Sequence, residues 1–342
     1  MIKIFDISQA EAWDEVVKSF PNYDIYYLSG YLKAFYIHGD GKPQLLYYTA
    51  DGIRAIYVYM QREIAEGVYD IITPYGYGGI LFDGDVSEDK LLSFKTDYQQ
   101  FLVEKGVVDN FVRYHPILNN AKNMRSLFTI IDLGETIAMD LSSEDIIWNN
   151  ITSKNRNMIR KAEKNGVEIL HSRDWGLFDD FMRIYNSTMN KDNAEDYYYF
   201  KDGFYCSIHN DLYDNYEMFY AVYKGEIIAM SIMIFANDRM HYHLSGSLSE
   251  YRNLAPSNLL LYKAALWGCH QGFDIFHLGG GIGSGEDSLF KFKAAFNRSS
   301  NFQFSIGKEI FNHEKYDELV NDRISKDPLF DCKSAFFPLY RS

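Results

Sequence analysis

Two stretches of the chain carry apolar, strand-like runs on both sides of a short polar turn. The first, QLLYYTADGIRAIYVYMQREI (residues 44–64), has Asp51-Gly52 between its two runs. The second, MFYAVYKGEIIAMSIMIFAN (residues 218–237), has Lys224-Gly225 at the corresponding place. A dipeptide ending in glycine between two such runs is a strong signal for a tight hairpin turn. The pattern therefore predicts two pairs of antiparallel strands.

The elements that follow the two hairpins have the same order, namely strand, glycine-rich turn, amphipathic helix and strand. The pattern predicts them in residues 69–84, 87–107 and 109–117 after the first hairpin, and in residues 240–248, 255–272 and 273–281 after the second. Gly106 and Gly272 stand where each helix would end, and Ser87 and Ser257 stand where each would begin. The chain therefore contains an internal duplication.

Helical patterns also precede each hairpin. They cover residues 8–20 and 26–39 in the first half, and residues 143–166 and 172–190 in the second. Helices, antiparallel strands, a crossing helix and a late strand describe an α/β (α+β) domain with a mixed, largely antiparallel sheet flanked by helices. We expect one such domain in residues 1–140 and another in residues 141–342.

Length, charge and cysteine content exclude several classes of protein. The chain has 342 residues and a net charge of −13, which argues against broad DNA binding, because that binding needs basic residues to neutralise phosphates. Its longest apolar run, Ile227 to Ala236, is too short to span a bilayer, and the first residues lack a signal-peptide core. The three scattered cysteines indicate neither a disulfide framework nor a zinc site. We expect a cytoplasmic protein with no membrane span, no DNA partner and no metal.

The segment FHLGGGIGSGEDSLFKFKAAF (residues 276–296) holds five glycines within seven residues and then two lysines. It is not a Walker A loop, because Glu286 and Asp287 follow Gly285 where lysine and serine or threonine are required. It is not a dinucleotide-binding loop either, because the third glycine of that motif would fall on Ser284 or Glu286. We expect these glycines to let the backbone turn sharply at the end of a strand.

A basic segment stands out in the acidic chain. In SKNRNMIRKAEKNG (residues 153–166), Arg156, Arg160 and Lys164 recur every four residues and so share one helical face. Two interpretations stay open. The face contacts a phosphate-bearing substrate, or it is a solvated helix whose lysines favour the dipole at its C-terminal end.

Several stretches resemble signature segments of the Fem-type aminoacyltransferases, which build the interpeptide bridge of peptidoglycan. They are SKNRNMIRKAEKNGVEI, YRNLAPSNLLLYKAALWGCHQGFDIFHLGGG and DSLFKFKAAF, with GYLKAF, TPYGYGGILFDG and VRYHP in the first half. The resemblance covers most of the chain and implies two tandem GNAT-like domains, in agreement with the duplication. It also implies transfer of an amino acid to an amine of a muramyl-peptide precursor, with aminoacyl-tRNA as the candidate donor. The chain lacks sustained heptads and so is similar to the compact members without a coiled-coil arm.

The resemblance also implies site residues. Phe292-Lys293 matches the Phe-Lys pair at the family's active site, where the lysine is thought to stabilise developing negative charge. The alternative for Lys293 is a solvated helix lysine, an interpretation that suits Lys291 better. Lys33 in GYLKAF matches a lysine that contacts the nucleotide diphosphate of the precursor, although it could also be an ordinary surface lysine. Arg156 is a candidate for the same phosphates.

Other candidates have weaker support in the sequence. Asp83 falls near an acidic residue implicated in some members of the family. Tyr75 and Tyr77 could stack on a substrate ring or simply pack. The remaining substrate-binding candidates are Arg113, Arg160, Tyr242 and Arg252.

Tyr242 is predicted to lie on a strand, with His241 and His243 facing the opposite side. An H-x-H pair can bind a metal. No third ligand is evident in the sequence, so we interpret both histidines as core or cleft residues.

Acyl transfer to an amine passes through a tetrahedral oxyanion, which needs positive charge or N–H donors but no covalent nucleophile. Consistently, the chain has no G-x-S-x-G motif. Enzymes of the GNAT type that use acyl-CoA bind its pyrophosphate at the start of the crossing helix, and here that place reads RNLAPS, with Pro256 lacking an N–H. We therefore expect no cofactor. A GNAT-type N-acyltransferase with a CoA or carrier-bound donor and a small-molecule acceptor, and a non-catalytic binding protein, stay open as alternatives.

Overall fold

The computed structural model describes residues 1–342, which form two compact units. The first unit comprises Met1–Leu133 together with Phe304–Ser342, and the second comprises Gly134–Gln303. The chain therefore passes between the units twice. This division differs from the single boundary expected near Asp140, because the C-terminal residues belong to the first unit.

The first unit contains one mixed sheet of six strands in line. In the order of pairing they are β1 (Ile2–Asp6), β2 (Lys42–Ala50), β3 (Ile53–Ala65), β4 (Val68–Ile72), β6 (Val107–Arg113) and β13 (Phe302–Ile310). The β4–β6 pair is parallel, and the β1–β2, β2–β3, β3–β4 and β6–β13 pairs are antiparallel. A short strand, β5 (Leu81–Gly84), pairs with the first residues of β3.

The second unit has the same arrangement. Its strands in order of pairing are β8 (Glu168–Ser172), β9 (Tyr216–Tyr223), β10 (Glu226–Ala236), β11 (Arg239–Ser247), β12 (Ile275–Gly279) and β7 (Ile130–Asp140). Here β11–β12 is the parallel pair, and all other neighbours are antiparallel. The duplication predicted from the sequence is therefore present, as two sheets of one topology.

The sixth strand of each sheet comes from outside the repeat that supplies the other five. In the second unit this strand is β7, which precedes its other elements in the chain, whereas in the first unit it is β13, which follows the whole second unit. Ile306 to Ile310 of β13 pair with Arg113 to Asp109 of β6. Backbone hydrogen bonds of this ladder hold the C-terminal segment to the first unit.

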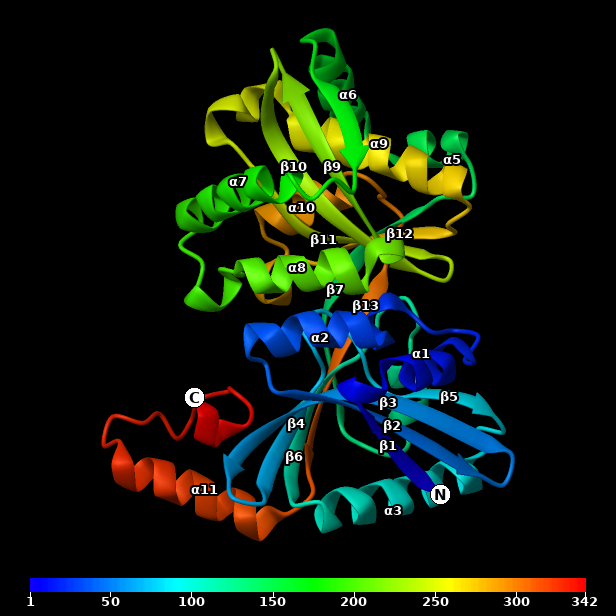
Figure 1. Cartoon of the computed structure of the whole chain (residues 1–342), viewed down its shortest axis with the longest axis vertical. Helices are drawn as coiled ribbons and strands as arrows, with labels where there is room; N and C mark the ends of the chain where they lie inside the picture. The colour runs from blue at the N-terminus through cyan, green and yellow to red at the C-terminus, as the bar shows by residue number, and fades with distance from the viewer. The chain divides into compact units, whose positions relative to one another are not determined.

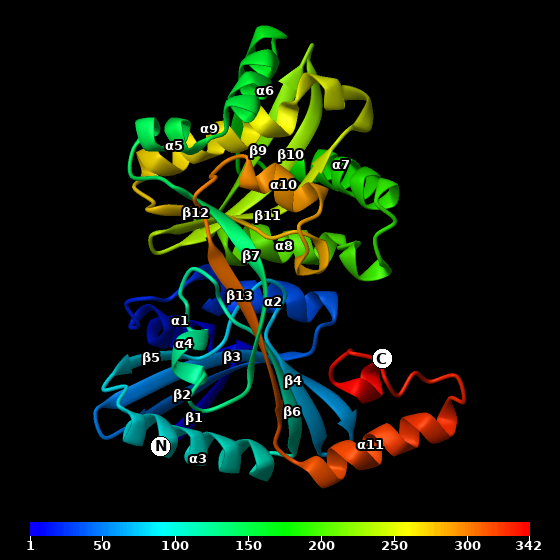
Figure 2. The same ribbon diagram turned by 180° about the vertical axis from the view of Figure 1, so that it is seen from behind.

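Helices cover both faces of each sheet (Figures 1 and 2). In the first unit α3 (Glu88–Glu104) lies on one face, and α1 (Ala10–Lys18) and α2 (Ser29–His38) lie on the other. In the second unit α9 (Pro256–Gln271) lies on one face beside α5 (Glu144–Asn150) and α6 (Ser153–Lys164). The opposite face carries α7 (Leu177–Lys191) and α8 (Asp202–Asp211). Three further helices are α4 (Ala121–Met124), α10 (Ser288–Ala294) and α11 (His313–Lys326).

The two predicted hairpin turns are confirmed, and each needs a left-handed backbone at both of its residues. The φ angles are 42° at Asp51 and 85° at Gly52, and 52° at Lys224 and 82° at Gly225. Two positive φ angles match the twist of the flanking strands. One predicted cap is wrong: α9 is capped by Ala255 and begins at Pro256, so Ser257 lies inside the helix. Proline favours the first helical position because its φ is already fixed there.

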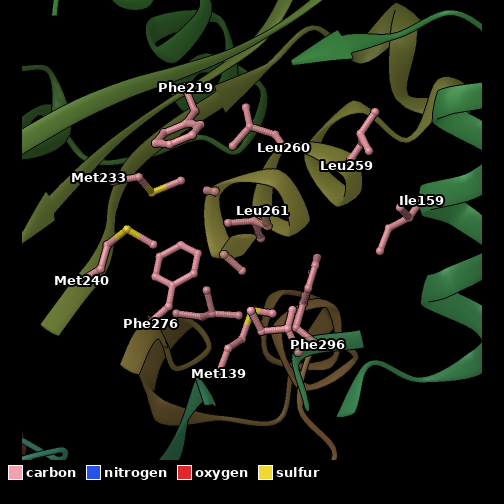
Figure 3. Close-up of a cluster of buried hydrophobic side chains, with 14 of the residues drawn as sticks. Met139, Ile159, Phe219, Met233, Met240, Leu259, Leu260, Leu261, Phe276 and Phe296 are labelled. Atoms are coloured by element: carbon pink, nitrogen blue, oxygen red, sulfur yellow. The ribbon is translucent and has the colours of Figure 1, made fainter. Parts of the chain in front are cut away.

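A single apolar core joins α9 and α10 to the sheet of the second unit. Figure 3 shows Leu260 and Leu261 of α9 above Phe276 of β12, with Phe296, just beyond α10, beside Met139 of β7. All five side chains are at most 2% exposed. This packing fixes the position of α10 and of the lysines on it.

Candidate active site

Lys293 lies on α10 with its side chain buried, and its ammonium points back at the glycine-rich loop. Only 8% of the residue is exposed, and Nζ donates a hydrogen bond of 2.7 Å to the carbonyl oxygen of Gly280. Burial lowers the pKa of Lys293 to about 8, and the Asp287 carboxylate opposes that lowering. The interpretation of Lys293 as a solvated helix lysine is therefore wrong. Lys291 is exposed, as expected.

The helical period explains why these two lysines differ. Leu289, Phe292 and Phe296 recur at the spacing of one helical face, and Lys293 falls on that same face. Phe292 and Phe296 meet edge to face, with ring centroids 5.5 Å apart. Lys293 is thus a cation placed within an apolar stripe, whereas Lys291 falls outside it.

The glycine-rich loop turns immediately after β12. Gly279 has a φ of 81° and Gly283 a φ of 61°, which is a conformation that glycine adopts at little cost. The loop then ends at Asp287, which caps α10 by accepting a hydrogen bond from the backbone N–H of Phe290 at 2.8 Å. The prediction of a sharp turn at the end of the strand is confirmed at Gly279 and Gly283.

Tyr242 lies beside Lys293, with Nζ 6.0 Å from the centre of its ring. It is the first residue of β11 beyond the parallel pairing with β12, which ends at His241 and His277. Burial raises the pKa of Tyr242, so its hydroxyl is protonated at neutral pH. The structure therefore brings together two predicted residues that are distant in the sequence, Lys293 and Tyr242.

His241, beside Tyr242, and His277 on β12 are buried, whereas His243 is half-buried. The rings of His241 and His277 meet edge to face at 5.6 Å, and Nε2 of His277 lies 2.9 Å from the hydroxyl of Thr136. Burial, assisted by His241, lowers the pKa of His243 to about 3, so this imidazole is neutral. Within the second unit His241 and His277 pack as core groups.

In the first unit, the predicted Tyr77 belongs to an aromatic cluster just beyond the ends of β4 and β6. Its ring centroid is 5.6 Å from those of Tyr26 and His115, and 5.5 Å from that of Phe304. Burial raises the pKa of Tyr77 to about 12. The cluster contains Tyr26 and His115, which the sequence did not single out.

Tyr75 and Arg113 lie at the margin of the same cluster. The ring of Tyr75 stacks on Phe35 of α2 at 5.5 Å. Nε of Arg113 donates a 2.8 Å hydrogen bond to the carbonyl of Gly76, and its guanidinium lies 5.2 Å from the centre of the Phe304 ring. Lys33 is half-buried on α2.

Asp83 has a partner of its own. It lies on β5, where its Oδ2 accepts a 2.6 Å hydrogen bond from Nε of Arg54 on β3. Arg54 in turn donates to the carbonyl of Ser19 at 2.7 Å, which ties the end of α1 to the sheet. These contacts give Asp83 a structural role that does not require a substrate.

The basic face on α6 divides into two parts. Arg156 donates hydrogen bonds to the carbonyl of Trp148 at 3.2 Å and to the hydroxyl of Ser153 at 3.3 Å, and so joins α6 to α5. Arg160 is exposed, with its guanidinium 5.0 Å from the Trp148 ring, and Lys164 is exposed as well. Arg156 therefore has structural partners, whereas Arg160 and Lys164 remain accessible.

The 3₁₀ turn Ser249–Leu254 precedes α9 and contains Arg252, whose side chain is exposed. The carbonyl of Arg252 accepts the N–H of Ala255 at 3.1 Å, and Ala255 has a φ of 56°. Asn258, in the first turn of α9, donates from its side chain to the Oδ1 of buried Asn155 at 2.7 Å. Side-chain contacts thus occupy part of the start of α9.

Sequence reasoning missed two parts of the Lys293 site, the carbonyl of Gly280 and the carboxylate of Asp287. A backbone acceptor carries no signal in the sequence. Asp287 was considered in the sequence, but only as a residue that excludes a Walker A loop.

Comparisons with known proteins agree with this architecture. Residues 152–291 match the family model described as the acetyltransferase (GNAT) domain. The crystal structure of FemX is similar over 92% of this chain and 99% of that one, with a TM-score of 0.68 and 15% identity. A protein of unknown function from Bacteroides thetaiotaomicron is similar over 91% of this chain and 100% of its own, with a TM-score of 0.62 and 12% identity.

The structure of L-PGS from Bacillus licheniformis is also similar, over 94% of this chain and 97% of that one, with a TM-score of 0.50 and 12% identity. No curated protein matches the chain. Similarity at such low identity establishes the fold, which is a tandem pair of GNAT-type domains, as the resemblance implied. None of the helices combines the length and the apolar character needed to cross a membrane.

Proposed function

We propose that the protein transfers an aminoacyl or related acyl group to an amine of a cell-envelope acceptor resembling a muramyl-peptide precursor. In this proposal the acceptor amine attacks the donor carbonyl directly, without a covalent enzyme intermediate. The carbonyl oxygen gains negative charge as the C–N bond forms, and the donor's leaving oxygen departs when the tetrahedral intermediate collapses. In the same sequence the acceptor nitrogen loses a proton, and the departing oxygen takes up a proton and leaves as a hydroxyl group.

The observation that carries the proposal is the state of Lys293. Its pKa of about 8 keeps the ammonium mainly protonated at pH 7 although the residue is buried. One of the three N–H donors is taken by the Gly280 carbonyl, which fixes the direction of the ammonium and leaves two donors for an oxyanion. A positioned charge in a water-poor site stabilises an oxyanion far better than a solvated one does.

The choice of acceptor rests on the resemblance to Fem-type enzymes and on the likeness in fold to FemX. Aminoacyl-tRNA is the donor that this resemblance favours. The match to the acetyltransferase (GNAT) domain favours a second candidate, an N-acyltransferase with acyl-CoA as donor. Pro256 at the first position of α9 argues against that candidate, because it removes one N–H from the place where GNAT enzymes bind pyrophosphate.

A transfer assay with both donors tests the proposal. The purified protein is incubated with a nucleotide-linked muramyl pentapeptide and either a pool of aminoacyl-tRNAs or acetyl-CoA, and mass spectrometry identifies the modified acceptor. Lys293→Met keeps the stem but removes the charge, and loss of one such contact typically lowers turnover by ~10²–10³. Lys291→Met is the matched control and should retain wild-type turnover.

Each result has a definite meaning. Transfer from aminoacyl-tRNA that Lys293→Met alone abolishes supports the proposal. The same dependence with acetyl-CoA supports the second candidate instead. Full activity in Lys293→Met with either donor overturns the assigned role of Lys293, and absence of transfer by the wild type from both donors overturns the proposed acceptor.

A further inference from the structure

We infer that Asp287 is a positioning residue for Lys293: its carboxylate binds the glycine-rich loop to the start of α10 and so holds in place the Gly280 carbonyl to which the ammonium is bonded. The inference rests on the proposed function, in which Lys293 acts as a cation. Asp287 touches neither substrate nor reacting atoms in this role and acts through Lys293.

The Asp287 carboxylate accepts two hydrogen bonds from the backbone. Oδ1 accepts the N–H of Phe290 at 2.8 Å, an ordinary helix cap. Oδ2 accepts the N–H of Ile282 at 3.1 Å, five residues back along the chain. A helix cap needs only the first of these bonds. The second bond, from Ile282, closes the loop onto α10.

The glycine-rich loop packs closely around this carboxylate. A Cβ atom on Gly281 would lie 2.5 Å from Oδ1 of Asp287 and 2.3 Å from the carbonyl oxygen of Gly285. On the other side of the loop, a Cβ atom on Gly134 would lie 2.0 Å from the carbonyl oxygen of Ser284. All three distances are shorter than real Cβ contacts, so the loop can pack this closely only with glycine at these positions.

The loop is also connected to the lysine. Gly280 starts the loop and accepts the hydrogen bond from Lys293, while Asp287 ends it and stands at the start of the same helix. The two contacts hold the loop at both ends. A loop held in this way keeps the Gly280 carbonyl, and with it the ammonium, in one place.

The charge of Asp287 also affects the protonation of Lys293. Two titratable groups act on the ammonium: Asp287, at the start of its own helix, whose charge opposes the lowering of the Lys293 pKa, and Tyr242 on β11, whose ring centre lies 6.0 Å from Nζ. Tyr242 is neutral because burial raises its pKa, so Asp287 supplies the only charge that favours the protonated lysine. Hydrogen bonds from the backbone N–H of Phe290, above all, lower the pKa of Asp287, so its carboxylate is ionised near neutral pH.

Competitive labelling with acetic anhydride tests this inference without any substrate. The full-length protein is labelled at a series of pH values from 6 to 10, and the reactivity of each lysine is read by mass spectrometry after chymotryptic cleavage. Phe292 lies between Lys291 and Lys293, so cleavage there separates the two. The wild-type midpoint for Lys293 should lie near its pKa of about 8.

Three variants are compared with the wild type. Asp287→Asn keeps the shape of the side chain and removes its charge. Asp287→Ser keeps a helix cap but can neither reach Ile282 nor supply charge, so it remains informative if the asparagine variant folds poorly. Glu286→Gln removes a neighbouring exposed carboxylate and serves as the control.

We expect both Asp287 variants to lower the labelling midpoint of Lys293 by about one pH unit, because removing a nearby anion disfavours the cation. The midpoint of Lys291 should not move in any variant, and Glu286→Gln should leave Lys293 unchanged. In the transfer assay, the alkaline limb of the Asp287→Asn pH profile should shift downward by the same amount, a change that loss of stability alone would not produce.

An unchanged Lys293 midpoint in both Asp287 variants overturns the inference and leaves the role of Lys293 intact. An equal shift in Glu286→Gln overturns it as well, because the effect would then be general. Full activity in Lys293→Met would overturn the proposed function while the labelling shift could still stand. The two failures are therefore distinguishable.

Discussion

The ammonium of Lys293 and the carbonyl of Gly280, thirteen residues apart in the chain, are joined by a 2.7 Å hydrogen bond. This contact makes the glycine-rich loop and the lysine after it one structural unit. By composition the loop resembles a phosphate-binding motif, but in the structure its Gly280 carbonyl binds the Lys293 ammonium.

The first prediction concerns the pH dependence of activity. The pKa of Lys293 is lowered by burial to about 8, and the proposed role needs the protonated form. Turnover should therefore be independent of this group below about pH 7 and should fall as pH rises through 8. The kcat profile of the wild type between pH 6 and 9.5 checks this. A rate that rises steadily across pH 8 would instead indicate that the neutral amine is the active form.

The second prediction concerns a pair of buried carboxylates in the first unit. Asp70 and Asp109 face each other on β4 and β6, fully buried, and the hydroxyl of Tyr340 lies 3.0 Å from the first and 2.6 Å from the second. One hydroxyl carries one proton and cannot donate to both. Burial, with the neighbouring Asp70 charge, raises the pKa of Asp109 to about 7, so at neutral pH this side chain is protonated about half the time and can then donate to Tyr340 itself.

The sign of the resulting pH dependence follows directly. Because the pKa of Asp109 in the folded protein exceeds its ordinary value of 3.8, its contribution to stability is complete below about pH 4 and is lost as pH rises through about 7. Asp109→Asn mimics the protonated acid and should remove this loss. Urea denaturation at pH 5 and pH 8 measures it. Tyr340→Phe should cost about 1–3 kcal/mol at either pH, because it removes the donor of the buried Asp109 carboxyl, whereas Asp70 keeps its hydrogen bonds from Arg62 and Arg341. A wild type equally stable at both pH values would contradict the assignment.

The third prediction concerns the donor. Helix α9 begins at Pro256, after Ala255 in the left-handed region, and the side chain of Asn258 is bonded to Asn155. Pro256 has no N–H, and the N–H of Ala255 is bonded to the carbonyl of Arg252, so the start of the helix offers fewer free N–H groups to a pyrophosphate. We expect isothermal titration to show no binding of acetyl-CoA in the micromolar range, which corresponds to about −8 kcal/mol. A clear micromolar isotherm would make the acyl-CoA donor the leading candidate.

The fourth prediction separates the two parts of the basic face on α6. Arg160 and Lys164 are exposed, so the double variant Arg160→Gln, Lys164→Gln should keep the melting temperature of the wild type. If this face binds a phosphate-bearing substrate, the variant should bind it more weakly, and the dependence of binding on salt should become shallower. Arg156→Gln should instead lower the melting temperature, because Arg156 bonds to the Trp148 carbonyl. Unchanged affinity in the double variant would make this face a solvated one.

Much of the fold could be predicted because its signals are local. The hairpins at Gly52 and Gly225 and the crossing helices α3 and α9 follow from turn chemistry and from helical period. The pairing of β13 with the sheet of the first unit, and of β7 with the sheet of the second, could not be predicted in this way. Pairing between β6 and β13 joins residues about two hundred positions apart, and nothing in either segment alone specifies its partner.

The candidate site shows the same division. The position of Lys293 came from a resemblance, but its burial was also readable, since it shares a helical face with Leu289, Phe292 and Phe296. Its partner at Gly280 was not readable, because a carbonyl exists at every residue. Asp83 was chosen by proximity in the sequence, and only the structure shows its ion pair with Arg54.

The late position of β13 has a consequence for synthesis on the ribosome. The sheet of the first unit lacks its sixth strand until the chain has been translated beyond Ile310, whereas β7 is made before the rest of the second unit. At about 5–20 residues per second, residues 114–301 take roughly 10–40 s to emerge. Throughout that interval one edge of β6 is unpaired, and another strand could pair with it wrongly. The nascent first half is therefore exposed to wrong strand pairing until β13 has been made.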